Sequence, residues 1–211
     1  MTAPVPTAQD LRDVVDAVMD GFAQLPDDAW DRPAHGLEWD CRDTAAHLLD
    51  DFGYYAMNLS GRRPQQDRYV ELLETTWRAG SPPQTFWPDP AGGTATMVRC
   101  VDAVGGLLVA VTATAPPGHV GFHPAGNADA SGFAAMGIVE GAAHAWDVLT
   151  AHDVDFRVDD GVLERVLNRL FPGAARTDDR WYDFLTATGR TDATRGQRWR
   201  WDSSVRDDYG R

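Results

Sequence analysis

Three polar residues interrupt an otherwise apolar stretch at residues 137–151, GIVEGAAHAWDVLTA. On a helix, Glu140 and His144 would share one face about 6 Å apart along the axis, and Asp147 would lie on the same face. A carboxylate and an imidazole at this spacing can bind one metal ion. Such pairs also occur on solvated helix faces, but the small apolar neighbours leave little of this face to water, and a buried carboxylate requires a partner. We therefore predict that Glu140 and His144 are metal ligands.

A second apolar stretch offers a third ligand. His47 stands between Ala46 and Leu48 in WDCRDTAAHLLDDFGYY, residues 39–55. A lone histidine in such a setting is more often a packed core residue, but the pair on the later helix favours a ligand. Three protein ligands leave a coordination position open, which is typical of catalytic zinc.

The remaining histidines and cysteines form weaker patterns. His119 and His123 lie among prolines and glycines in PPGHVGFHP, so we expect a loop that borders the pocket mouth and touches substrate, rather than a second metal site. His35 lies in the loop before the second predicted helix and His152 at the end of the fourth, and either could approach the site. Cys41 lies in the first turn of a predicted helix, where a thiolate is favoured, but no histidine base is identifiable beside it, so we predict a structural cysteine.

Four long amphipathic helices are expected to position these residues. Apolar periodicity and N-cap residues predict helices from Thr7 to about Leu25 and over residues 41–59, 94–113 and 131–151. No convincing strand pattern is present, so we predict an all-α four-helix bundle. Two shorter helices are expected within residues 159–171 and 178–189. The predicted organisation is a metal-binding bundle over residues 1–153 and a short, mostly helical C-terminal extension over residues 154–211 that packs on it.

Composition excludes several classes of function. The 211 residues, 43% of them hydrophobic, can form one ordinary domain with a full core. A formal net charge of −13 argues against nucleic-acid binding, which needs clustered cations. The longest apolar run, AVGGLLVAVTATAPP, is too short and too rich in glycine to span a bilayer, and the N-terminus shows no signal peptide. We therefore expect a soluble cytoplasmic protein that binds neither nucleic acid nor membrane.

The two ligand-bearing stretches carry a family resemblance. WDCRDTAAHL and VEGAAHAWDVLTA resemble the corresponding segments of the mycothiol-dependent maleylpyruvate isomerases, and a looser similarity is present in FLTATGR at residues 184–190. The resemblance implies the DinB-like four-helix bundle, with a divalent metal, usually zinc, held by His47, Glu140 and His144. It implies that Asp147 orients a ligating imidazole or positions the helix.

The resemblance also implies a thiol cofactor, mycothiol. A metal-coordinated thiol is deprotonated at neutral pH. We therefore expect a zinc-dependent or other divalent-metal enzyme that uses a low-molecular-weight thiol for cis–trans isomerisation of a small electrophilic substrate, or for S-transfer to it. Two alternatives remain: a thiol-independent metal enzyme in a biosynthetic tailoring step, and a non-catalytic bundle that binds a metal or small ligand. A homodimer is compatible with each. The absence of lysine and the single isoleucine indicate a high-GC genome, as in the actinobacteria that make mycothiol.

Substrate-contacting residues are harder to assign. The resemblance implies an arginine near the substrate, and several arginines between the second and third helices or on the third could supply it: Arg62, Arg63, Arg68, Arg78 and Arg99. We take Arg99, His119 and His123 as candidate catalytic residues.

Overall fold

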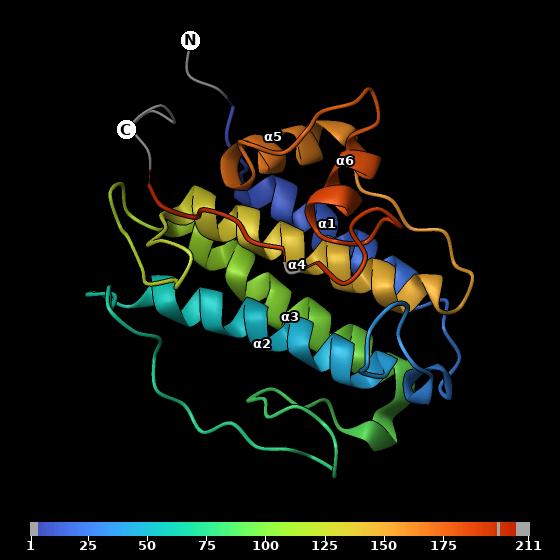
Figure 1. The fold of residues 1–211 in the computed structure, drawn as a ribbon. Helices are drawn as coiled ribbons and strands as arrows, with labels where there is room; N and C mark the ends of the chain where they lie inside the picture. Colours follow the sequence, from blue (N-terminus) through green and yellow to red (C-terminus); the bar gives the residue numbers. More distant parts are fainter. Residues whose placement is uncertain (1–3, 198, 206–211) are drawn as a thin grey trace.

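The computed structural model describes residues 4–197 and 199–205 and contains a bundle of four long helices (Figure 1). The bundle helices are α1 (Ala8–Phe22), α2 (Cys41–Ser60), α3 (Gly93–Thr114) and α4 (Ala130–Thr150). Helices α1 and α2 each pack against both α3 and α4, so they occupy opposite corners of the bundle. Isolated β-bridges occur within the described residues, but no strand does. The predicted all-α bundle is confirmed.

Side-chain caps begin these helices where the sequence predicted. The Thr7 hydroxyl accepts a hydrogen bond from the Asp10 N–H, and the Asp10 carboxylate accepts one from the Thr7 N–H, which completes a capping box. The Asp40 carboxylate caps α2 by accepting a hydrogen bond of 2.8 Å from the Asp43 N–H. Helix α1 ends at Phe22, short of the predicted end near Leu25, because the chain turns ahead of Pro26 and a residue before proline disfavours the helical conformation.

Helix α4 is the central helix of the core. Every residue from 132 to 145 is buried. Gly137 and Gly141 allow neighbouring helices to approach closely: a β-carbon at Gly137 would lie 2.7 Å from a methyl group of Leu108 on α3. Polar side chains on this helix therefore have little access to water, and they must be satisfied by one another or by a ligand.

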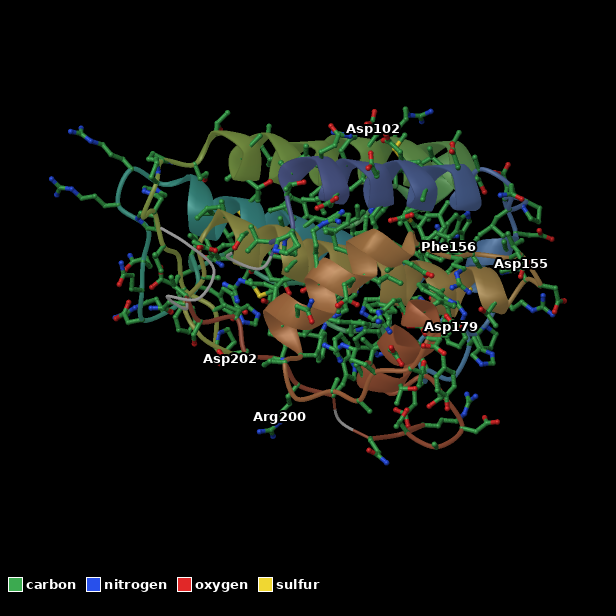
Figure 2. The ribbon with its side chains drawn as sticks, turned by 90° about the horizontal axis from the view of Figure 1, so that it is seen from above. Asp102, Asp155, Phe156, Asp179, Arg200 and Asp202 are labelled. Carbon is green, nitrogen blue, oxygen red and sulfur yellow. The ribbon has the colours of Figure 1, made fainter. Side chains whose placement is uncertain are left out.

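The outer face of α3 is less covered. The segment Pro90–Thr114, which combines the short 3-10 helix η2 (Pro90–Gly92) with α3, is long and apolar enough to cross a membrane, and only 28% of its most apolar window is buried. In this structure α3 packs on α1 and α2, with Asp102 on the outer side of the bundle (Figure 2). Core helices of soluble proteins share this composition, so the absence of membrane binding stays a prediction, as does the cytoplasmic location.

The C-terminal extension covers the opposite side of the bundle from α3. Its helices α5 (Asp160–Leu170) and α6 (Arg180–Ala187) lie over α1 and α4 (Figure 1), and Asp179, Arg200 and Asp202 mark this side in Figure 2. Helix α5 buries Leu163, Val166 and Leu167 against the bundle. The predicted helical extension is confirmed, whereas the domain division at residue 153 stays a prediction, and residues 206–211 lie outside the described part.

The long connector between α2 and α3, residues 61–92, lies along α2 on the side away from α5 and α6 (Figure 1). Two aspartates of α2 hold it. The Asp43 carboxylate accepts a hydrogen bond of 2.8 Å from the Ser81 hydroxyl. The Asp50 carboxylate accepts hydrogen bonds from the backbone N–H groups of Thr85 and Phe86. The helix that carries His47 therefore also fixes the connector beside it.

Candidate metal centre

Two pairs of side chains face each other across α2 and α4. His47 Nε2 lies 3.5 Å from Asp51 Oδ2 on α2, and His144 Nε2 lies 3.2 Å from Glu140 Oε2 on α4. The two imidazole rings meet edge to face, with their centroids 5.2 Å apart. Donor atoms of His47, Asp51 and His144 all lie within 4.8 Å of one another. The structure thus brings His47 and His144 together with Asp51, while the third predicted ligand, Glu140, contacts His144 on α4.

Sequence reasoning missed Asp51, although a signal was present. Asp51 follows His47 by four residues, the same spacing that singled out Glu140 and His144. The adjacent Asp50 makes the pair look like a solvated helix face. In the structure Asp50 points to the connector instead, and Asp51 points to α4.

This donor set fits a divalent cation. Asp51 Oδ2 and Glu140 Oε2 are buried, and apart from the histidine of each pair they have no polar partner among the described residues. Burial raises the pKa of the Asp51 carboxyl well above its ordinary value, and the nearby Glu140 charge raises it further. Burial likewise lowers the pKa of His47 to about 4. A cation between two imidazoles and two carboxylates would compensate both effects, because it favours neutral histidine and ionised carboxylate.

Asp147 connects His144 to the C-terminal extension. Its Oδ2 lies 3.1 Å from His144 Nδ1, and its two oxygens accept hydrogen bonds from Arg190. Burial alone would raise the pKa of Asp147, but the His144 and Arg190 contacts outweigh burial and lower it. Since Nδ1 of His144 contacts Asp147, Nε2 is directed to the cluster, as in carboxylate–histidine–zinc triads.

Two cavities reach this cluster. A cavity of about 450 Å³ is lined by His47, Glu140 and His144 together with residues of the C-terminal extension, among them Arg190 and Arg195. We call it the extension cavity. A cavity of about 520 Å³ lies on the connector side and is also lined by His47. We call it the connector cavity; it is further lined by Asp50, Asp51, Tyr54, Tyr55, Tyr69, Val70, Glu71, Leu72, Glu74 and Pro83. Both volumes fall in the range of small-molecule sites.

The structure places the predicted catalytic residues Arg99 and His119 elsewhere. Arg99 is exposed on α3, where it donates a hydrogen bond to the Thr96 hydroxyl. His119 is half-buried, and its Nε2 lies 2.8 Å from the Gly61 carbonyl oxygen. Neither residue lines the extension cavity or the connector cavity. The loop with His119 instead lines a separate groove beside Val5.

His123 lies in a loop, as predicted, but it is buried near the cluster and not at a pocket mouth. Its ring stacks on Trp201 and meets the edge of Tyr55, whose hydroxyl donates to Glu140 over 3.5 Å. Its Nδ1 accepts a hydrogen bond from the Ala125 N–H. Burial lowers its pKa to about 4. His123 thus packs behind Glu140 and lines neither cavity.

The arginines beside the cluster come from the C-terminal extension. Arg190 and Arg195 line the extension cavity, whereas Arg78 of the connector pairs with Asp40 and Asp43. Sequence reasoning missed both arginines of the extension because no metal-site pattern surrounds them. The FLTATGR segment, which ends at Arg190, was the available signal.

Cys41 has a histidine neighbour that the sequence did not reveal. Its Sγ lies 3.7 Å from Nε2 of His152. The same nitrogen lies 3.1 Å from the Ala29 carbonyl oxygen, to which it must donate, so it cannot accept the thiol proton. Burial raises the pKa of the Cys41 thiol to about 12. These contacts describe a packed thiol. Of the two flanking histidines, His35 lines the extension cavity and His152 does not.

One protein family matches most of this chain. The model of the mycothiol maleylpyruvate isomerase N-terminal domain matches residues 11–149, from within α1 to within α4. The chain belongs to this family. The matched region contains all the residues of the cluster and its aspartate partner: His47, Asp51, Glu140, His144 and Asp147. No curated protein and no solved structure matches the chain. Family membership identifies a mycothiol-related, metal-binding, DinB-like protein, whose further activity is inferred below.

Proposed function

We propose that this protein is a zinc-dependent enzyme that uses a low-molecular-weight thiol, such as mycothiol, for cis–trans isomerisation of a small electrophile or for S-transfer to it. The observation that carries the proposal is the grouping of His47, Asp51 and His144, with Glu140 paired to His144, where two cavities meet. His47, Glu140 and His144 would hold the ion, with Asp51 available as a further donor. When bound, a divalent ion supplies Lewis acidity that lowers the pKa of a coordinated thiol or water.

The extension cavity suits an anionic, planar electrophile. Arg190 is committed to Asp147, but the Arg195 side chain is 45% exposed and interacts with the fully exposed Asp192. A carboxylate of a substrate can replace that weak surface pair, because exposed ion pairs contribute little. Trp39, Trp146 and Trp199 supply flat apolar walls for a conjugated group.

The connector cavity has the opposite chemistry. Asp51, Glu71 and Glu74 would repel an anion, while Tyr54 and Tyr69 can hydrogen-bond to hydroxyl or amide groups. A neutral, hydroxyl-rich thiol fits this cavity better than an anionic electrophile does. We therefore expect the thiol to reach the cluster from the connector side and the electrophile from the extension side.

One observation favours the non-catalytic alternative. Two imidazoles and two carboxylates are enough to fill a tetrahedral zinc site, and a filled site has no position for a reactant. An Asp51→Ala variant distinguishes this alternative, because loss of that carboxylate would open a coordination position. Cytoplasmic location and a homodimer stay predictions.

The test combines metal analysis with a thiol panel. The purified protein is expected to carry one divalent ion per chain, and His47→Ala and His144→Ala are each expected to lose the ion and the turnover. His119→Ala is the matched control, because this histidine lies outside both cavities and contacts the Gly61 carbonyl instead. Candidate electrophiles are incubated with individual thiols, and the products are identified by mass spectrometry.

The outcomes separate the three functions. Thiol-dependent product supports the proposal, and thiol-independent product supports a Lewis-acid enzyme instead. A different result is a visible spectrum of the cobalt-substituted protein that thiols leave unchanged in the wild type and change only in Asp51→Ala. That result indicates a filled, non-catalytic site. Full turnover after removal of the metal would end the metal hypothesis altogether.

A further inference from the structure

We infer that Arg190 is a positioning residue for the metal centre: it holds both oxygens of Asp147, which in turn fixes the imidazole of His144. The C-terminal extension would thereby set how tightly the bundle binds its ion. This inference rests on the proposed metal site, but it concerns a residue outside the matched family region, at residues 11–149.

The contact between Arg190 and Asp147 is bidentate. Arg190 Nε donates to Asp147 Oδ1 over 2.9 Å, and its Nη2 donates to Oδ2 over 2.6 Å. Both side chains are buried, with 7% of the arginine and 2% of the aspartate exposed. A planar guanidinium fork of this kind fixes the plane of the carboxylate, which a single hydrogen bond does not. The carboxylate oxygen that faces His144 Nδ1 at 3.1 Å therefore cannot rotate away.

The end of α6 aims Arg190 into the bundle. The chain reverses at Gly189, which has a φ of +72°, and the Arg190 N–H donates to the Leu185 carbonyl over 2.7 Å. A β-carbon at Gly189 would lie 2.9 Å from the Gln197 carbonyl oxygen, so only glycine fits here without strain. This local geometry explains why glycine and arginine are adjacent in FLTATGR.

All three nitrogens of the Arg190 guanidinium have partners within the protein. Besides the two contacts with Asp147, its Nη1 donates to the Thr188 carbonyl over 2.8 Å, and its carbon lies 5.3 Å from the centre of the Trp199 ring. Each of its three nitrogens thus has a partner within the protein. Although Arg190 lines the extension cavity, two of its three hydrogen bonds go to Asp147, and we therefore assign it to that carboxylate.

Fold stability is a poor explanation for this buried ion pair. The cost of removing two charges from water often exceeds the attraction between them, and such pairs can be replaced by apolar residues without loss of stability. The pair lies one hydrogen bond from a metal-ligand candidate, and partners of ligating histidines typically affect metal affinity by about 10- to 100-fold. A role at the metal centre therefore accounts for it better.

The test is metal affinity in Arg190 variants of the full chain. Arg190→Met is expected to weaken zinc binding by about 10- to 100-fold in competition with a chromophoric chelator. Arg190→Lys is expected to recover part of that loss, because an ammonium binds one carboxylate oxygen at a time. If Arg190 acts through Asp147, Asp147→Asn and the double variant with Arg190→Met should show nearly the same zinc affinity.

Two further measurements distinguish positioning from general damage. In the metal-free protein, the His144 Nδ1 proton is expected as a slowly exchanging NMR resonance that is lost in Arg190→Met. Arg157→Met is the matched control, since Arg157 is an exposed arginine of the same extension that pairs with Asp160 and Asp179. If Arg190→Met does not fold, Arg190→Lys carries the comparison.

The inference is overturned if Arg190→Met and Arg190→Lys bind zinc as tightly as the wild type, or if Arg157→Met weakens binding equally. Failure of the proposed function can be distinguished from failure of the inference about Arg190. A wild type that binds zinc in an Arg190-dependent way but turns over no substrate retains the inference without the enzyme. A wild type that binds no ion under any condition removes both.

Discussion

Asp50→Ala is expected to release the connector between α2 and α3 while the bundle stays folded. The Asp50 carboxylate accepts hydrogen bonds from the Thr85 N–H at 2.9 Å and from the Phe86 N–H at 2.7 Å. Asp50 is only 7% exposed, and its backbone belongs to α2, so the carboxylate ties the connector directly to the bundle. Helix α2 itself needs no part of the connector to stay helical.

The size of the effect follows from these hydrogen bonds. A hydrogen bond to a charged group contributes about 1.5–3 kcal/mol, and the freed N–H groups regain water when the connector lifts, so we expect a local loss of about 2–3 kcal/mol. Because each 1.4 kcal/mol is a factor of ten, the open population should increase about 30- to 150-fold. The bundle helices should change little, since their contacts remain.

Hydrogen exchange measured by mass spectrometry and NMR can test this. The informative amide is that of Gln84, which donates to the Thr75 carbonyl over 3.0 Å and is not touched by the substitution. Its exchange should accelerate by the factor above, and amides of α4 should not. Asp50→Asn, which retains one acceptor oxygen, should give a smaller change, and Asp67→Ala, an exposed carboxylate of the same connector, should give none. Unchanged exchange at Gln84, or equal acceleration in α4, would refute the reasoning.

Two further predictions concern stability. Gly105→Ala should destabilise the protein by about 1–3 kcal/mol, because the new β-carbon would lie 2.9 Å from both methyl groups of Val15. Gly106→Ala should stabilise the protein by up to about 1 kcal/mol, because the nearest neighbour of its new β-carbon is the flexible end of Arg12. Urea unfolding that shifts the stability of both variants in the same direction contradicts this pair of predictions. Burial lowers the pKa of His123 from 6.5 to about 4, so on acidification the unfolded chain binds a proton at His123 before the folded chain does. The free energy of unfolding should therefore fall by up to about 1.4 kcal/mol per pH unit as the pH drops from 6.5 to about 4. In unfolding measured with a chelator present at about pH 7 and about pH 5, His123→Gln should lose less stability between the two pH values than the wild type. If the two proteins lose the same amount, the pKa of His123 is not lowered in the folded protein.

The bundle could be predicted because its signals are local. Caps such as Thr7 with Asp10 and Asp40 with Asp43 operate within one helical turn, and the structure contains both. The same holds for the Glu140 and His144 spacing, which needs only a helix to place both side chains on one face. Local patterns of this kind survive in almost any tertiary arrangement.

The rest of the site depends on packing that spacing does not encode. Asp51 is distinguished from Asp50 only by which neighbour each one meets, the cluster on α4 or the connector. Arg190 lies 43 residues from Asp147 in sequence, and their contact forms only once α6 has docked. His123 looked like an exposed loop residue because glycine and proline surround it, yet the ring of Trp201 covers it. Each of these outcomes required the tertiary structure.

The position of His47 at the boundary of the extension cavity and the connector cavity has a kinetic consequence. Two reactants that approach from opposite sides do not compete for an entrance, so neither must bind first. A two-substrate reaction at this cluster should therefore follow random-order steady-state kinetics through a ternary complex. Each product should then inhibit competitively against the reactant that shares its side.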